Sequence, residues 1–145
     1  MPAGSYSITL KNQHEQLLAL ENWLHLLAAS CRLSAEVSFR LELVLTEAVT
    51  NVMDYSCDPG REGLIALSCE VQEDRLQIQI SDDGPPFDPT ARAPVNLPKS
   101  LEEARPGGLG IHLMRQYTRG MQYKRDGDRN VLRMYLPLSA SRPSA

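Results

Sequence analysis

Prolines divide this chain into two regions that can hold regular structure. Six of its ten prolines lie within 22 consecutive residues: Pro85, Pro86, Pro89, Pro94, Pro98 and Pro106. Proline fixes its φ angle and has no backbone N–H, so this stretch is excluded from regular helix and from central strands. The helices and strands must come from the residues before and after it. With 145 residues, the chain has the length of one domain, at roughly 100–200 residues per domain.

Apolar spacing predicts the elements before the prolines. Alternation of apolar and polar residues predicts strands at Tyr6–Leu10, Leu64–Val71 and Leu76–Asp82. Apolar residues at intervals of three and four predict two helices, over residues 12–30 and from Ser34 to a stop at residues 58–60.

The residues after the prolines add a third helix and a hairpin. The glycine cluster Gly107–Gly110 opens the helix, and Met121–Arg125 and Val131–Leu138 are expected to pair around a turn. At the other end of the chain, Asn12 is expected to cap the first helix. Strands that are mostly antiparallel, with helices gathered on one face, predict an α+β two-layer sandwich.

Charge, hydropathy and cysteine use exclude several functional classes. The formal net charge of −3 and the pI near 5.6 argue against a nucleic-acid-binding protein, because such domains tend to be basic. No apolar run is long enough to span a membrane, and the N-terminus lacks the features of a secretory signal. The three cysteines show no metal-binding or redox spacing, so we expect reduced thiols in a cytoplasmic protein.

Two polar residues of the second predicted helix are the first candidates for chemistry. Glu47 and Asn51 are four residues apart, so they project from one side of the helix, beside its apolar stripe. The pair is either part of a solvated helix face or a functional site. In a functional site, the carboxylate can act as a general base and the amide oxygen can bind a hard cation such as Mg²⁺.

A carboxylate is expected on the core side of the strand that precedes the prolines. Leu76, Ile78 and Ile80 alternate onto one face of this strand, and the next position of that parity is Asp82. Burying an unpaired charge is costly, so the carboxylate needs a partner, for which the exocyclic amine of a purine would serve. The alternative is that the strand has ended and Asp82 begins a turn.

Glycines mark the start of the third predicted helix. Gly107, Gly108 and Gly110 allow a ligand to approach the backbone, and a helix N-terminus offers free N–H groups and a positive dipole end. The cluster is a phosphate site in principle, although a simple helix start explains it equally well. It matches neither a Walker A loop nor the dinucleotide-binding fingerprint.

The order of these motifs resembles that of the GHKL ATPase family. Glu47–Tyr55 resembles the family's N box, Asp82–Pro89 its first glycine box, Gly107–Leu113 its second and Asn130–Arg133 its last strand. From Tyr6 to Leu138 the chain is similar to the serine-kinase anti-sigma factors of bacterial partner-switching systems, the RsbW and SpoIIAB type. The resemblance implies the Bergerat ATP-binding fold, with ATP and Mg²⁺ as cofactors.

The resemblance also implies a role for each motif residue. Glu47 would be the general base, Asn51 would ligate Mg²⁺ and Asp82 would accept a hydrogen bond from the adenine amine. Gly84 would make room for the adenine ring. The remaining nucleotide-binding residues would be Tyr55, Phe87, Gly107, Gly108, Leu109, Gly110 and Ile111. Tyr55 stands where these kinases usually carry a histidine, and a tyrosine can stack or donate one hydrogen bond but has different proton chemistry.

The proline-rich segment would be an ATP lid. In this interpretation residues 90–106 cover the phosphates, and Lys99 or Arg105 meets the γ-phosphate. Residues 1–138 would form a single ATP-binding kinase domain, followed by a flexible tail at residues 139–145.

The resemblance implies a protein serine/threonine kinase with regulatory partners. Its substrate would be a STAS-domain anti-anti-sigma protein, and it would sequester a sigma factor or an analogous target. We expect a homodimer with no direct contact to nucleic acid or membrane. The alternative is a binding module in which ATP shapes a sequestration surface without phosphoryl transfer. The catalytic half of a histidine kinase is disfavoured, because no dimerising helical hairpin fits before Glu47.

Overall fold

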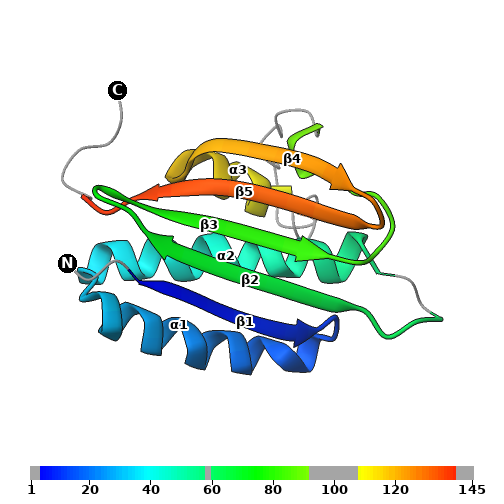
Figure 1. Cartoon of the computed structure of the whole chain (residues 1–145), viewed down its shortest axis with the longest axis horizontal. Helices are drawn as coiled ribbons and strands as arrows, with labels where there is room; N and C mark the ends of the chain where they lie inside the picture. The colour runs from blue at the N-terminus through cyan, green and yellow to red at the C-terminus, as the bar shows by residue number, and fades with distance from the viewer. Residues whose placement is uncertain (1–3, 58–59, 92–107, 140–145) are drawn as a thin grey trace, which may run out of the picture.

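Five strands form one antiparallel sheet in the computed structural model, which describes residues 4–57, 60–91 and 108–139. The strands are β1 (Ser5–Lys11), β2 (Leu64–Val71), β3 (Arg75–Asp82), β4 (Arg119–Asp126) and β5 (Arg129–Pro137). Their order across the sheet is β1-β2-β3-β5-β4, and each neighbouring pair is antiparallel. This order places β3 at the centre, between β2 and β5 (Figure 1).

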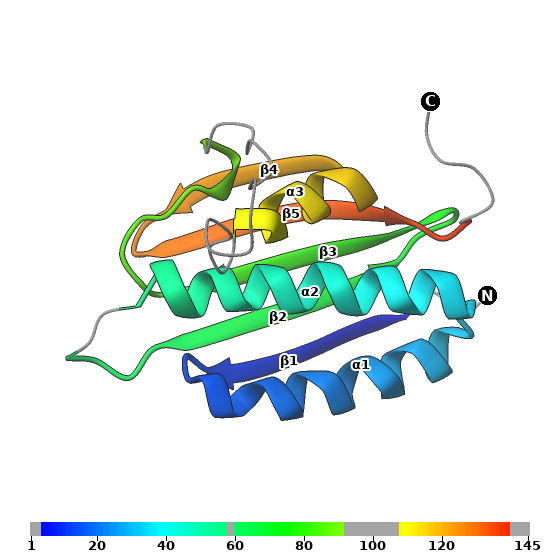
Figure 2. The same cartoon turned by 180° about the vertical axis from the view of Figure 1, so that it is seen from behind.

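Three helices cover one face of the sheet, as Figure 1 and Figure 2 show from opposite sides. They are α1 (Leu17–Cys31), α2 (Ala35–Tyr55) and α3 (Gly108–Tyr117), with short 3₁₀ turns at η1 (His14–Gln16) and η2 (Pro89–Ala91). In Figure 2, α2 crosses the middle of the sheet between α1 and α3. The predicted α+β two-layer sandwich is therefore confirmed.

The core lies between α2 and the central strands. Leu76, Ile78 and Ile80 of β3 belong to the same buried cluster as Leu41 of α2, and none of these side chains is more than 2 % exposed. Because strand side chains alternate between the two faces, the same parity carries Asp82 to the helix side of the sheet. Asp82 is buried there, as the sequence predicted.

The two long helices begin differently. Ser34 caps α2, because its Oγ accepts a hydrogen bond from the Val37 N–H at 3.1 Å. The prediction that Asn12 caps α1 is wrong, because the 3₁₀ turn η1 separates the two and the α-helix begins at Leu17 without a side-chain cap. The Nδ2 of Asn12 donates instead to the carbonyl of Ser56, just after α2, at 3.1 Å.

The C-terminal hairpin is longer than predicted. Its first strand, β4, begins at Arg119 rather than Met121, with a bulge between Arg119 and Gln122. Residues 92–106 of the predicted lid and the tail from residue 140 lie outside the described residues. None of the helices in the described ranges is both long and apolar enough to cross a membrane.

Candidate functional site

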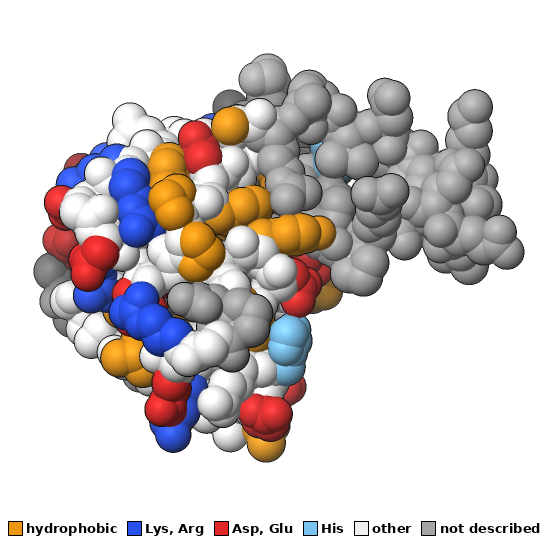
Figure 3. Space-filling model, turned by 90° about the vertical axis from the view of Figure 1, so that its right-hand side faces the viewer, with side chains coloured by type: hydrophobic (Ala, Val, Ile, Leu, Met, Phe, Trp, Pro, Cys, Tyr) orange, Lys and Arg blue, Asp and Glu red, His pale blue; other side chains and the backbone are white. Residues whose placement is uncertain are grey.

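A pocket opens at the end of the molecule where α2 and β3 both end. It holds about 340 Å³ of empty volume, its open mouth included. Figure 3 views this end of the molecule and shows a group of hydrophobic side chains on its surface. The pocket is lined by Ala48, Asn51, Val52, Ile80, Asp82, Phe87, Pro89, Met114, Tyr123, Asn130 and Leu132. Three residues singled out in the sequence, Asn51, Asp82 and Phe87, are thus brought together.

Asp82 is held by one of its two carboxylate oxygens. Its Oδ1 accepts hydrogen bonds from the Ser56 hydroxyl at 2.6 Å, from the Gly84 N–H at 3.0 Å and from Nδ2 of Asn130 at 3.0 Å. Among the described residues, no hydrogen bond reaches its Oδ2. A carboxylate oxygen is a hydrogen-bond acceptor, so Oδ2 can accept a bond from a donor that enters the pocket.

Asn130 lies opposite Asp82 in the pairing of β3 with β5 and completes this network. Its Oδ1 accepts hydrogen bonds from the Tyr123 hydroxyl at 2.5 Å and from the Phe87 N–H at 3.2 Å. Its Nδ2 also donates to the Pro85 carbonyl at 2.9 Å. Both polar atoms of the amide are engaged, so this wall of the pocket is fixed before any ligand binds.

The loop after β3 is pressed against the end of α2. A Cβ at position 84 would overlap the carbonyl oxygen and the Oγ of Ser56, so glycine is required for Gly84 to pack there. Arg125 holds the same loop, because its Nη1 donates to the Gly84 carbonyl at 2.8 Å. The glycine that was expected to make room for an adenine ring therefore has a packing reason of its own.

Asn51 is a buried amide without a partner among the described residues. It is 2 % exposed and lines the pocket, and within the described part of the chain neither its Oδ1 nor its Nδ2 forms a hydrogen bond. Leaving a buried polar group unsatisfied costs about 1–3 kcal/mol, so such a group marks a place where a ligand can supply the bond. An amide oxygen is a suitable ligand for Mg²⁺, so the residues present fit a magnesium nucleotide.

Glu47 lies one helical turn before Asn51 and is half-buried. Burial raises the pKa of its carboxyl, and the negative charge of Asp54 raises it further. Both effects bring the pKa nearer to neutral pH, which suits a general base. Glu47 is absent from the residues that line the pocket, so the structure brings Asn51 into the pocket wall and leaves Glu47 beside it.

The aromatic residues expected at the site stack on each other. The ring centroids of Tyr55 and Phe87 are 5.3 Å apart, with 19° between the ring planes. This contact joins the last turn of α2 to the loop after β3, on the same side as the Ser56–Asp82 hydrogen bond. Phe87 also lines the pocket, whereas Tyr55 is not among the residues that line it.

The glycine cluster is only partly described. Gly108, Leu109 and Gly110 form the first turn of α3, where backbone N–H groups have no partner within the helix. The side chain of Ile111 packs in the core at 1 % exposure. Lys99, Arg105 and Gly107, the other expected phosphate contacts, lie outside the described residues.

Three residues of the network were not singled out as site residues in the sequence: Ser56, Tyr123 and Asn130. The parity argument that placed Asp82 also applies to Asn130, because Asn130, Leu132 and Met134 alternate onto the buried face of β5. No local pattern marks Ser56 or Tyr123, since their roles depend on which strands become neighbours.

Comparison with known proteins identifies related sequences. The family model described as histidine kinase-like ATPase domain matches residues 10–136. Serine/threonine-protein kinase BtrW of Bordetella bronchiseptica is 35 % identical over 106 residues, which cover 72 % of this chain and 75 % of BtrW. Serine-protein kinase RsbW of Halalkalibacterium halodurans is 32 % identical over 90 residues, which cover 59 % of this chain and 54 % of that protein. The match to RsbW therefore spans about half of that relative's length.

A solved structure supports the fold. The histidine kinase domain of the blue-light activated histidine kinase EL346 of Erythrobacter litoralis matches with a TM-score of 0.51 and 20 % sequence identity. The match covers 71 % of this chain and 45 % of that one. At this identity the likeness concerns the arrangement of sheet and helices and carries no information about substrate.

Proposed function

Because the chain belongs to the histidine kinase-like ATPase domain family, we propose that it is an ATP-dependent protein serine/threonine kinase. Its likeness to proteins named serine-protein kinases supports the choice of a hydroxyl as acceptor. The observation that carries the proposal is a pair of buried residues in one pocket. Among the described residues, the amide of Asn51 and the Oδ2 of Asp82 have no hydrogen-bond partner. We assign residues 1–138 to a single ATP-binding domain.

The adenine of ATP binds at the Asp82 end of the pocket. Oδ2 of Asp82 accepts a hydrogen bond from the exocyclic amine, while Oδ1 keeps its three bonds within the chain. The network fixes the direction of this acceptor, because Ser56 and Asn130 hold the carboxylate from two elements. A purine with an amine is thereby favoured over one with a carbonyl at that position, since two facing acceptors repel.

The phosphates bind toward Asn51 and the first turn of α3. The Oδ1 of Asn51 would hold a Mg²⁺ ion, and backbone N–H groups of Gly108 and Gly110 would face the phosphate oxygens. A magnesium ion at this place would neutralise charge on the phosphates during an in-line transfer. Lys99 or Arg105 would meet the γ-phosphate from residues 90–106, the segment assigned as the lid.

Glu47 acts as the general base. Its carboxylate takes the proton of the acceptor hydroxyl as that oxygen bonds to the γ-phosphorus, and the bond between the phosphorus and the β–γ bridging oxygen breaks to release ADP. The raised pKa of Glu47, caused by burial and by the Asp54 charge, makes its carboxylate a better proton acceptor.

The partners follow from the likeness to RsbW. The acceptor would be a serine or threonine of a STAS-domain anti-anti-sigma protein, and the sequestered target would be a sigma factor or an analogous regulator. The protein would work in the cytoplasm as a homodimer.

Substitution of Glu47 tests the kinase assignment. Glu47→Gln keeps the size of the side chain and removes the base, so ATP binding should be retained and phosphoryl transfer to a STAS-domain protein should fall by about 10²–10⁴-fold. Glu36→Gln, on the exposed side of the same helix, is the matched control and should transfer at the wild-type rate. A Glu47→Gln variant that transfers phosphate at the wild-type rate would show that the base is misassigned.

One observation favours an alternative, which is an ATP-binding sequestration module without phosphoryl transfer. Glu47 lies beside the pocket rather than in its wall, so ATP could bind without meeting a base. In this case the wild-type protein would bind Mg²⁺–ATP and its target, but no radiolabel from [γ-³²P]ATP would reach the STAS-domain protein.

A further inference from the structure

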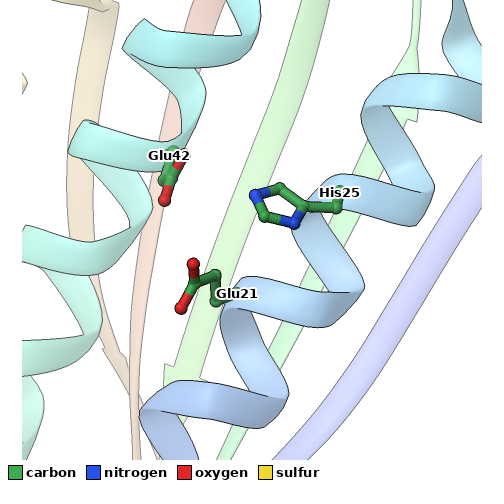
Figure 4. Close-up of side chains that lie close together, drawn as sticks. All are labelled: Glu21, His25 and Glu42. Carbon is green, nitrogen blue, oxygen red and sulfur yellow. The ribbon is translucent and has the colours of Figure 1, made fainter.

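We propose that Glu21, His25 and Glu42 form a binding site for one divalent transition-metal ion, such as Zn²⁺, between α1 and α2. One ligand atom from each residue lies within 4.8 Å of the other two. Figure 4 shows the three side chains pointing into the space between the two helices. None of them lines the proposed nucleotide pocket, so this site is independent of the proposed kinase function.

The two helices present these side chains from fixed positions. Glu21 and His25 are four residues apart on α1 and therefore share one face of that helix, while Glu42 comes from the neighbouring helix α2. Each of the three directly follows a leucine of the core: Leu20, Leu24 and Leu41, which are at most 2 % exposed. The packed leucines hold the spacing of the ligand set, so it does not depend on bound metal.

No cation of the described chain neutralises the two carboxylates. Within the described ranges, neither Glu21 nor Glu42 forms an ion pair or a hydrogen bond. Arg40, two residues before Glu42, forms an ion pair with Glu36 instead, with 2.8 Å between its Nη2 and the Oε1 of Glu36. Two carboxylates held close together repel each other, and a divalent cation between them relieves that repulsion.

The donor types select the kind of metal. An imidazole nitrogen with carboxylate oxygens suits Zn²⁺ and Co²⁺, whereas Mg²⁺ and Ca²⁺ prefer ligand sets made only of oxygen. Bonds of about 2.0–2.2 Å to Zn²⁺ require the three ligand atoms to move closer together than they are now. Because Glu21 and His25 are exposed, rotation of their side chains can provide this movement. Three protein ligands leave a fourth position for water.

A metal at this site would clip α1 to α2. An ion that binds the folded chain and not the unfolded chain raises the midpoint of thermal unfolding, with no change in the nucleotide pocket. Bound metal would therefore stabilise the packing of α1 against α2.

The experiment uses the full chain without a purification tag, in a Cys57→Ser background, because Cys57 is an exposed thiol that could bind the same ions. Co²⁺ is titrated and followed by its visible absorption, and Zn²⁺ is titrated by calorimetry. We expect one ion per chain and a higher midpoint of thermal unfolding with Zn²⁺. His25→Asn, Glu21→Gln and Glu42→Gln should each weaken binding by more than about tenfold, since even groups that only orient a metal ligand contribute about that much.

Glu36→Gln is the matched control, because it removes a carboxylate of α2 that lies outside the triad, and it should bind metal as the parent does. Unfolding of every variant in EDTA checks that the substitutions leave the metal-free fold intact. The proposal is overturned if the parent takes up no Co²⁺ or Zn²⁺, or if the three triad variants bind as tightly as the Glu36→Gln control.

Discussion

The pocket has two groups of buried polar residues, here called its two ends, which differ in whether the described chain supplies their hydrogen bonds. At one end, Asp82 and Asn130 are 3 % and 4 % exposed, and the chain itself supplies their hydrogen bonds. At the other end, Asn51 is 2 % exposed and its amide has no partner among the described residues. Burial is nearly the same at both ends, so what differs is whether the described chain supplies hydrogen bonds to the buried atoms.

This difference separates stability from function. A polar group that the chain satisfies holds the fold together, and removing it leaves its former partners unpaired. A polar group that the chain leaves unsatisfied lowers stability, and it is retained when a ligand needs it. Substitutions at the two ends should therefore shift the free energy of unfolding in opposite directions, although both should weaken ATP binding.

The largest loss of stability is expected from substitution of Asp82. Asp82→Ala leaves the donors of Ser56, Gly84 and Asn130 without their shared acceptor, so the free energy of unfolding should fall by about 3 kcal/mol, measured by urea denaturation. ATP binding should be lost as well.

Asp82→Asn separates these two consequences. The asparagine keeps one oxygen for the Ser56 and Asn130 donors, so the expected loss of stability is only about 1 kcal/mol. It places an N–H₂ donor where the adenine amine needs an acceptor, so ATP binding measured by calorimetry should still be lost. Wild-type affinity for ATP in Asp82→Asn would contradict the assignment of Asp82 as the adenine acceptor.

The next largest loss of stability is expected in the loop after β3, which packs against Ser56 near Asp82. A Cβ at Gly84 would overlap backbone and side-chain atoms of Ser56, so Gly84→Ala should cost about 2 kcal/mol in thermal or urea unfolding. Gly60→Ala is the matched control, because a Cβ there meets nothing within 4 Å, and it should change stability by less than about 0.5 kcal/mol. Equal stability of the two variants would mean that the loop is free to move away from α2.

Periodicity predicted most of the fold because it reports which face of an element is buried. The alternation in β3 predicted both the strand and the burial of Asp82, and Ser34 correctly marked the start of α2. Asn12 shows the limit of this reasoning. Its amide could cap the adjacent helix or bond elsewhere, and the contact that it makes is with Ser56, 44 residues away in sequence.

The candidate site shows the same limit. A spacing of four residues places Glu47 and Asn51 on one side of α2, but it cannot say whether other segments of the chain supply hydrogen bonds to them. That depends on the neighbours that folding brings to each end of the pocket. Asp82 gains Ser56 and Asn130 from distant segments, whereas Asn51 gains no partner in the described chain.

Substitution of Asn51 is expected to raise the free energy of unfolding, whereas substitution of Asp82 lowers it. Asn51→Ala removes two buried atoms that have no partner in the described chain, and it improves helix propensity, so the free energy of unfolding should rise by about 1 kcal/mol. Asn22→Ala, at an exposed position of α1, is the control for helix propensity alone, and its free energy of unfolding should rise by less. The Mg²⁺ dependence of ATP binding should disappear in Asn51→Ala and persist in Asn22→Ala. A loss of stability at Asn51→Ala would mean that the fold, rather than a ligand, satisfies this amide.

The smallest effect is expected on the pH dependence of activity, through the charge of Asp54. The Asp54 carboxylate is the second cause, after burial, of the raised pKa of Glu47. A base must be deprotonated to act, so kcat/KM rises with pH through the pKa of Glu47. Asp54→Asn removes the repulsion, lowers that pKa and moves the acid limb of the pH profile to lower pH. His14→Ala is the control, because it breaks the 3.1 Å contact between His14 and Asp54 but keeps the Asp54 charge. The acid limb should not move to lower pH in His14→Ala, and a limb that stays unchanged in Asp54→Asn would mean that Glu47 does not set it.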